Sequence, residues 1–354
     1  MKRRMKNSVR TLFSVQGVIK GVINRLKIGA IAAIFFSISS GFNVALADEA
    51  VLADDSFTPY IKTPGISGAL LSVGSDTLAG TMTQWVEAFE DLYPNVDGQV
   101  QVSGSSTAPP ALTEGTAQFG LMSRPMRSQE LEAFERAHGY RPLALRIAID
   151  AIGVFVHRDN PLKSLSFQQL DAIFSATLRC GENQAITTWA QLGFDYPWAQ
   201  RRIQLFSRNS VSGTYGFFKQ KVLCEGDFQN RVNEQPGSAS VVQSVASSIS
   251  AIGYSGVGFR MSGVKLLAIS QDGKKAVMPT QQTILNREYP LSRYLYIYIN
   301  KDPRQPLPPL QREFIRFIYS QQGQAIVAKE GYMPISAALA KRELQQAVES
   351  SDRS

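Results

Sequence analysis

Side chains that bind metals or activate nucleophiles are scarce in this sequence. Its 354 residues include only two cysteines and two histidines. His138 and His157 lie far apart in the chain and have no Cys or His neighbours at the spacing of metal ligands, so we expect no metal site. A Gly-x-Ser-x-Gly motif is also missing, which argues against a serine hydrolase.

Acidic residues are absent from the first 47 positions, and this explains the basic composition. The chain has 37 Lys and Arg against 29 Asp and Glu, a formal charge of +8. Eight of these cations lie within residues 1–47, so residues 48–354 carry no net formal charge. A nucleic-acid-binding domain needs a cationic face. We therefore expect no nucleic-acid partner.

Residues 1–47 have the pattern of a secretory signal peptide. The basic segment is followed by an apolar run from Ile28 to Phe36, and Ala45-Leu46-Ala47 matches a small-x-small cleavage site. The alternative is a membrane anchor, but the apolar run is too short to span a bilayer comfortably. We therefore predict export to the periplasm, with a linker over residues 48–65.

Cys180 and Cys224 are the only thiols in the chain. Two cysteines in an exported protein usually pair. We predict a disulfide between them, and the alternative is two buried free thiols.

Segments that predict strands alternate with segments that predict helices. The clearest helix follows Ser75 and has one apolar face, formed by Met82, Trp85, Phe89 and Leu92. We also predict a helix capped by Ser128 and ended by Gly139, and helices over residues 165–174 and 238–250. This alternation favours an α/β fold with a mixed or parallel sheet and helices on its faces.

Two extended runs, residues 141–157 and 294–300, stand out in this pattern. Because the first is longer than an ordinary strand, we expect it to cross from one lobe to another. The second could carry the chain back, so that helices from Leu310 onward complete the first lobe. The predicted lobes are residues 66–151 with 293–354, and residues 152–292.

Four predicted strand-to-helix turns carry small hydroxyl residues: 74–77, 104–107, 123–125 and 208–214. A helix start exposes unpaired N–H groups and the positive end of the helix dipole. At the carboxyl ends of strands, such turns can together hold a small oxyanion, with Arg124 and Arg208 as bidentate donors. Each turn alone also fits plain helix capping.

These turns resemble those of the phosphate-binding protein family, the periplasmic receptors of the high-affinity phosphate ABC transporter. The most specific element is Arg208-Asn-Ser-Val-Ser-Gly-Thr214, and the likeness runs from about residue 70 to residue 335. It implies a type II periplasmic-binding-protein fold, with two α/β lobes joined by two crossing strands. We accordingly expect a monomer that is not an enzyme, needs no cofactor and contacts a membrane permease transiently.

The resemblance implies that inorganic phosphate contacts the four turns. The candidate ligands are Ser75, Asp76, Ser105, Ser106, Ser123, Arg124, Asp150, Arg208, Ser212, Gly213 and Thr214. Many family members have Ser-Asp where this chain has Ser123-Arg124, and that aspartate accepts a hydrogen bond from protonated phosphate. Rejection of sulfate requires such an acceptor. Asp150 is the first candidate, with a structural role in the hinge as its alternative, and Asp76 is the second, with helix capping as its alternative.

Other functions fit parts of the sequence. A secreted phosphate sensor or surface protein would keep the same binding residues without feeding a permease. A secreted phosphatase or serine hydrolase would use one of the serine turns, although no histidine lies near them in the sequence. Sulfate, molybdate and tungstate receptors share the two-lobed architecture, so the oxyanion itself also has alternatives.

Overall fold

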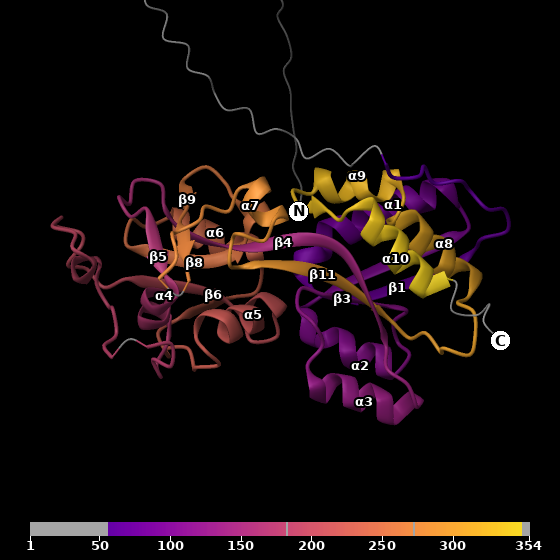
Figure 1. Ribbon diagram of the computed structural model, residues 1–354, viewed down its shortest axis with the longest axis horizontal. Helices are drawn as coiled ribbons and strands as arrows, with labels where there is room; N and C mark the ends of the chain where they lie inside the picture. The colour runs from indigo at the N-terminus through magenta and orange to yellow at the C-terminus, as the bar shows by residue number, and fades with distance from the viewer. Residues whose placement is uncertain (1–55, 182, 272, 349–354) are drawn as a thin grey trace, which may run out of the picture. The chain divides into compact units, whose positions relative to one another are not determined.

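The computed structural model describes residues 56–348, except for 182 and 272 (Figure 1). The predicted signal peptide and residues 48–55 of the predicted linker lie outside the described residues. Among the residues described, no helix is both long enough and apolar enough to cross a membrane.

A ten-stranded mixed sheet forms the centre of the fold, with the order β2-β1-β3-β11-β4-β8-β6-β7 and with β9 and β12 also paired to β4. β5 and β10 form a separate parallel pair. The strands are β1 Gly68–Gly74, β2 Val96–Val102, β3 Phe119–Met122, β4 Leu143–His157, β5 Ser164–Ser166, β6 Gln204–Arg208, β7 Asn233–Gln235, β8 Ala251–Gly256, β9 Val264–Leu266, β10 Ala268–Ser270, β11 Ser292–Ile299 and β12 Met333–Pro334.

The two long extended runs are confirmed as β4 and β11, which pair antiparallel and run side by side in Figure 1. β11 joins β4 to the parallel group β1, β2 and β3. β4 is hydrogen-bonded to β11 up to Ala151, and from Ile152 onward it pairs with β8, which leads to the parallel strands β6 and β7. The α/β fold therefore has two lobes linked by these two strands, while the residue boundaries of the lobes stay a prediction.

Helices cover the sheet of each lobe. They are α1 Ala79–Leu92, α2 Ala108–Thr113, α3 Ser128–His138, α4 Phe167–Phe174, α5 Gly213–Val222, α6 Ser238–Ala246, α7 Gln281–Leu285, α8 Pro309–Ile318, α9 Gln321–Lys329 and α10 Ala337–Val348. Two short 3-10 helices, η1 Asp76–Leu78 and η2 Ser105–Thr107, precede α1 and α2.

The predicted apolar face of α1 packs against helices from the end of the chain. Met82, Trp85 and Phe89 are fully buried, whereas Leu92 at the end of the helix is partly exposed. Trp85 Nε1 donates to the carbonyl oxygen of Gly323 in α9 at 2.8 Å, and the Phe89 ring meets that of Phe314 in α8 edge-on. The first and last segments of the described chain therefore share one core.

Three predicted helix boundaries were wrong by a few residues. Ser128 is the first residue of α3, and Arg127, whose backbone is extended, occupies the N-cap position; its N–H donates to the Glu130 carboxylate at 2.7 Å. α4 begins at Phe167, since residues 164–166 pair with β10. α6 ends at Ala246 rather than at residue 250. The hydroxyl of the next residue, Ser247, donates to the carbonyl oxygen of Ser244 at 2.7 Å, and such a local hydrogen bond competes with continuation of the helix.

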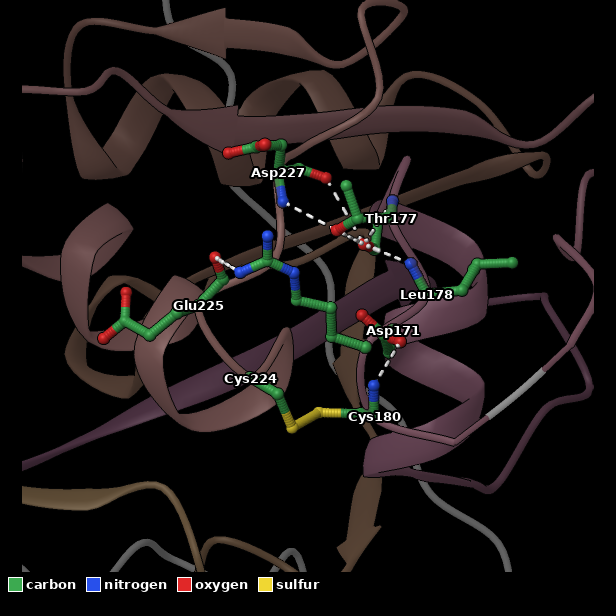
Figure 2. Close-up of a disulfide and its surroundings, with 9 residues drawn as sticks. Asp171, Thr177, Leu178, Cys180, Cys224, Glu225 and Asp227 are labelled. Atoms are coloured by element: carbon green, nitrogen blue, oxygen red, sulfur yellow. Dashed lines mark hydrogen bonds between the residues drawn. A yellow bond between two sulfur atoms is a disulfide. The ribbon is translucent and has the colours of Figure 1, made fainter.

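The predicted disulfide is confirmed: Cys180 and Cys224 are bonded, with 5.5 Å between their Cα atoms (Figure 2). It ties the loop after α4 to the residues that follow α5. Asp171 in α4 accepts a hydrogen bond from the N–H of Cys180 at 2.9 Å. Thr177 Oγ1 accepts another from the N–H of Asp227 at 3.0 Å, and the N–H of Ala176 donates to the carbonyl oxygen of Asp227 at 2.7 Å, so hydrogen bonds join the two segments in addition to the disulfide.

Removing the disulfide should destabilise this lobe. The bridge closes a loop with a sequence separation of 44, for which the chain-entropy model gives about 4 kcal/mol of stabilisation. We expect the double variant Cys180→Ser/Cys224→Ser to show a free energy of unfolding lower by up to that amount in guanidinium denaturation. Wild-type protein under reducing conditions should match the variant. Equal stability of the oxidised protein and the variant would contradict this expectation.

Candidate functional site

Three serines from three turns of the first lobe meet at one point. Ser75 follows β1, Ser105 opens η2 after β2, and Ser123 follows β3; all three side chains are buried. Their hydroxyl oxygens are linked through Ser123, at 3.1 Å from Ser75 and 3.2 Å from Ser105. They meet because the three strands are parallel and their carboxyl ends lie at the same edge of the sheet.

The start of α5, in the second lobe, lies against these serines. Ser212 is the N-cap of α5, and its hydroxyl accepts a hydrogen bond from the N–H of Thr214 at 3.1 Å. Gly213 is so close to the first lobe that a Cβ at this position would run into the hydroxyls of Ser105 and Ser123. The N-terminal N–H groups of a ten-residue helix, with the positive end of its dipole, are therefore directed at the serine cluster.

The two lobes are also joined through their backbones. The N–H of Ser106 donates to the carbonyl oxygen of Val211 at 3.1 Å. Gly104 has a φ of +127°, and a Cβ there would lie 2.6 Å from the same carbonyl oxygen. A side chain at residue 104 would therefore be strained and would also push the Arg208 loop away from the first lobe.

Arg208, the last residue of β6, bridges the two lobes. Its side chain is fully buried; Nη2 donates to Asp76 Oδ1 at 2.7 Å and Nη1 donates to Ser238 Oγ at 2.9 Å. Ser238 in turn donates to Asp76 Oδ2 at 3.2 Å, so both carboxylate oxygens of Asp76 accept hydrogen bonds. Nε of Arg208 is buried and has no partner among the described residues, which leaves one strong donor for an anion.

Asp150 and Arg293 form a buried ion pair where β4 meets β11. Nε and Nη2 of Arg293 both donate to Asp150 Oδ2, at 2.9 and 2.7 Å, and Nη2 also donates to Thr214 Oγ1 at 3.0 Å. Asp150 Oδ1 is buried and has no partner within the described part of the chain. Burial raises the pKa of Asp150, and the nearby Arg293 opposes this rise.

Arg124 is engaged differently from Arg208. Its guanidinium forms a bidentate pair with Glu130 in α3, at 2.7 and 2.6 Å, and donates to Ser106 Oγ at 3.2 Å. Burial alone would raise the pKa of Glu130, but its hydrogen bonds to Arg124 and Arg127 lower it overall. The contacts thus make Arg124 a support for the Ser106 turn, and its role as a direct ligand stays a prediction.

The structure therefore brings the four predicted turns to one place and adds residues that the sequence reasoning missed. The added residues are Thr77, Ser238 and Arg293. Thr77 Oγ1 lies 3.5 Å from Thr214 Oγ1, which links η1 to α5. A signal for Arg293 exists in the sequence: it is a cation at the start of an extended, otherwise aromatic and aliphatic run. A charge in that position requires a buried partner, which is Asp150.

This arrangement can hold a small oxyanion. Several hydroxyls, a helix N-terminus and the fork of Arg208 converge from both lobes, and each is a hydrogen-bond donor. The surroundings are buried, so charge-assisted bonds there are stronger than at a surface. The only carboxylate oxygen near these donors that lacks a partner among the described residues is Asp150 Oδ1, and it can accept one proton from a ligand.

Comparison with known proteins agrees with this geometry. Residues 61–322 match the model of the PBP superfamily domain. The chain is 51% identical over 322 residues to the phosphate-binding protein PstS of Pseudomonas aeruginosa, covering 91% of this chain and 99% of that protein. It is 28% identical over 268 residues to the protein SphX of Synechococcus elongatus, covering 75% and 77%.

Solved structures show the same fold. A phosphate ABC transporter substrate-binding protein of Clostridium perfringens with bound phosphate is 27% identical, with a TM-score of 0.63 and coverage of 76% of this chain and 100% of that chain. An ABC-type phosphate transport receptor of Vibrio cholerae, 22% identical, matches the fold with a TM-score of 0.60 and coverage of 75% and 100%. The chain therefore belongs to the PBP superfamily and, within it, to the family of PstS phosphate-binding proteins.

Proposed function

We propose that the protein binds inorganic phosphate between its two lobes and delivers it to the permease of an ABC transporter. The observation that carries the proposal is the convergence of Ser75, Ser105, Arg208 and the start of α5 on one buried place. The 51% identity to a phosphate-binding protein over nearly the whole chain supports the same function.

In this proposal some residues of the turns bind the phosphate and others position those ligands. The hydroxyls and the helix N-terminus donate to the phosphate oxygens, and Arg208 supplies the neutralising charge. The proposed ligands are Ser75, Ser105, Ser123, Arg208, Ser212, Gly213 and Thr214, with Thr77 added, while Asp76, Ser106 and Arg124 position them.

Asp150 is the proposed acceptor of the phosphate proton. Of the two candidate acids, Asp76 already accepts hydrogen bonds on both carboxylate oxygens, whereas Asp150 Oδ1 has no partner among the described residues. Phosphate near neutral pH keeps at least one proton and can donate to this oxygen, but sulfate has none. A buried carboxylate facing sulfate is left with an unrelieved repulsion.

The proposal involves no catalytic step. Neither histidine contacts the serine cluster: His138 Nε2 lies 3.0 Å from the carbonyl of Thr113, and His157 Nδ1 lies 3.7 Å from Asp159. Activation of a serine would need a neighbouring base. We further propose a monomer that is exported to the periplasm and meets the permease transiently; the disulfide supports an oxidising compartment.

Calorimetric titration tests the binding part of this proposal. Purified protein depleted of phosphate should bind one equivalent of inorganic phosphate at micromolar concentrations and should give no heat with sulfate. Absence of phosphate binding would overturn the proposal. Phosphate uptake by a strain that lacks the gene tests the transport part of the proposal. Normal high-affinity phosphate uptake by that strain would contradict it.

A further inference from the structure

A cavity lies near the serine cluster, at the strands that link the lobes. It has a volume of about 240 Å³, and residues of both lobes and of β11 line it. Its cations are Lys221 from α5, Arg287 from the loop before β11, and Arg293. No Asp or Glu is among the described residues that line it, so its own surface favours an anion.

Two of the three cations have no acidic partner within the described residues. Lys221 and Arg287 are exposed and form no ion pair there. Arg287 instead lies over the ring of Tyr294, with 4.4 Å between its guanidinium carbon and the ring centroid. Its φ of 60° is in the left-handed region, which costs energy for a residue other than glycine. Arg287 therefore lines the cavity in a backbone conformation that the surrounding structure must support.

Arg293 connects this cavity to the serine cluster. Its side chain is only 2% exposed, and Nη1 is buried without a partner among the described residues, while Nε and Nη2 bind Asp150. Asp150 neutralises the charge of Arg293. The charges of Lys221 and Arg287 are not neutralised by an ion pair within the described residues, so the cavity keeps a net positive charge that favours an anionic ligand.

The remaining walls of the cavity are largely apolar. Phe217, Tyr294 and Tyr296 line it together with two prolines and an isoleucine. Its volume is roughly eight times the ~30 Å³ that one water occupies in the liquid, which is more space than a bare tetrahedral oxyanion fills. We infer that this cavity is a second anion site, which takes a phosphate monoester with a small aromatic or aliphatic group, held by Lys221 and Arg287 beside the buried Arg293.

Phenyl phosphate is a suitable probe. Titrated into wild-type protein in the presence of saturating inorganic phosphate, it should bind with one equivalent and more tightly than a further equivalent of phosphate. The double variant Lys221→Met/Arg287→Met should weaken phenyl phosphate binding at least about tenfold, with little change in binding of the first phosphate. Lys219→Met is the matched control, because Lys219 is also on α5 but pairs with Asp227 at 2.7 Å; it should bind phenyl phosphate like the wild type.

The inference would be overturned if phenyl phosphate did not bind at millimolar concentration, or if its binding were unchanged in the double variant. Binding no tighter than that of a second inorganic phosphate would also overturn it. The variant Arg208→Met separates the two sites, because it should lose the first phosphate and keep phenyl phosphate. Phenyl phosphate binding that disappears with Arg208→Met would place the probe in the serine cluster and would also overturn the inference.

Discussion

Replacing Arg208 with methionine is expected to lower the phosphate affinity at least about tenfold, because the charge-assisted hydrogen bond from Nε, of about 1.5–3 kcal/mol, is lost. Arg208 is the fully buried cation that joins Asp76 of one lobe to Ser238 of the other. Its removal also leaves the carboxylate of Asp76 without its cation, facing an incoming anion. Calorimetric titration measures the affinity.

Two further variants make the Arg208 result specific. Arg208→Lys keeps the charge but not the planar fork, so its affinity should fall between those of the wild type and Arg208→Met. Arg231→Met removes another half-buried arginine of the same lobe, whose Nη1 donates to the carbonyl of Ile203 at 2.7 Å, and should bind phosphate normally. Unchanged binding by Arg208→Met with an intact near-UV circular dichroism spectrum would rule out Arg208 as a ligand.

The variant Asp150→Asn should lose discrimination between phosphate and sulfate. An amide can donate a hydrogen bond to sulfate and carries no repelling charge. We expect the ratio of phosphate to sulfate affinity to fall about 100-fold, given about 1–3 kcal/mol for each unmet or repulsive polar contact. Competition of sulfate against bound phosphate measures this ratio.

The same argument gives a pH dependence. Burial raises the pKa of Asp150, so its carboxylate takes up a proton at a higher pH than an ordinary aspartate as the solution is acidified. The protonated form donates rather than accepts. Sulfate affinity of the wild type should therefore rise as the pH falls through this raised pKa, whereas that of Asp150→Asn should lack this rise.

Asp171 provides the matched control for Asp150. It is also a fully buried aspartate, but its Oδ2 accepts the N–H of Cys180 in the second lobe, near the disulfide. Asp171→Asn should keep the wild-type preference for phosphate. If Asp150→Asn also kept it, the proton acceptor would have to be another group.

The sequence predicted the fold well because its signals are local. Periodicity located α1, and the length of the extended run over residues 141–157 identified β4, the strand that passes through both lobes. The hydroxyl turns were recognisable because each follows a strand and three of the four open a helix. Their meeting point could be expected from parallel strands, since the carboxyl ends of such strands share an edge.

Pairings between distant residues were not predictable in the same way. Nothing near Arg124 in the sequence indicates whether its guanidinium points to a ligand or to Glu130, because that choice depends on how α3 packs. The Arg293 side chain reaches Asp150 only through the register of β11 on β4, in which these two residues are direct partners. Register is set by the whole sheet, so a single strand does not reveal it.

The continuity of β4 restricts how the protein can release a bound ion. β4 is one uninterrupted strand, hydrogen-bonded to β11 as far as Ala151 and to β8 from Ile152. No flexible linker therefore interrupts β4 between the two lobes. Movement of the two lobes apart must bend β4 where its pairing changes from β11 to β8, directly beside the Asp150–Arg293 ion pair. Opening of the lobes would therefore also move the backbone that carries Asp150.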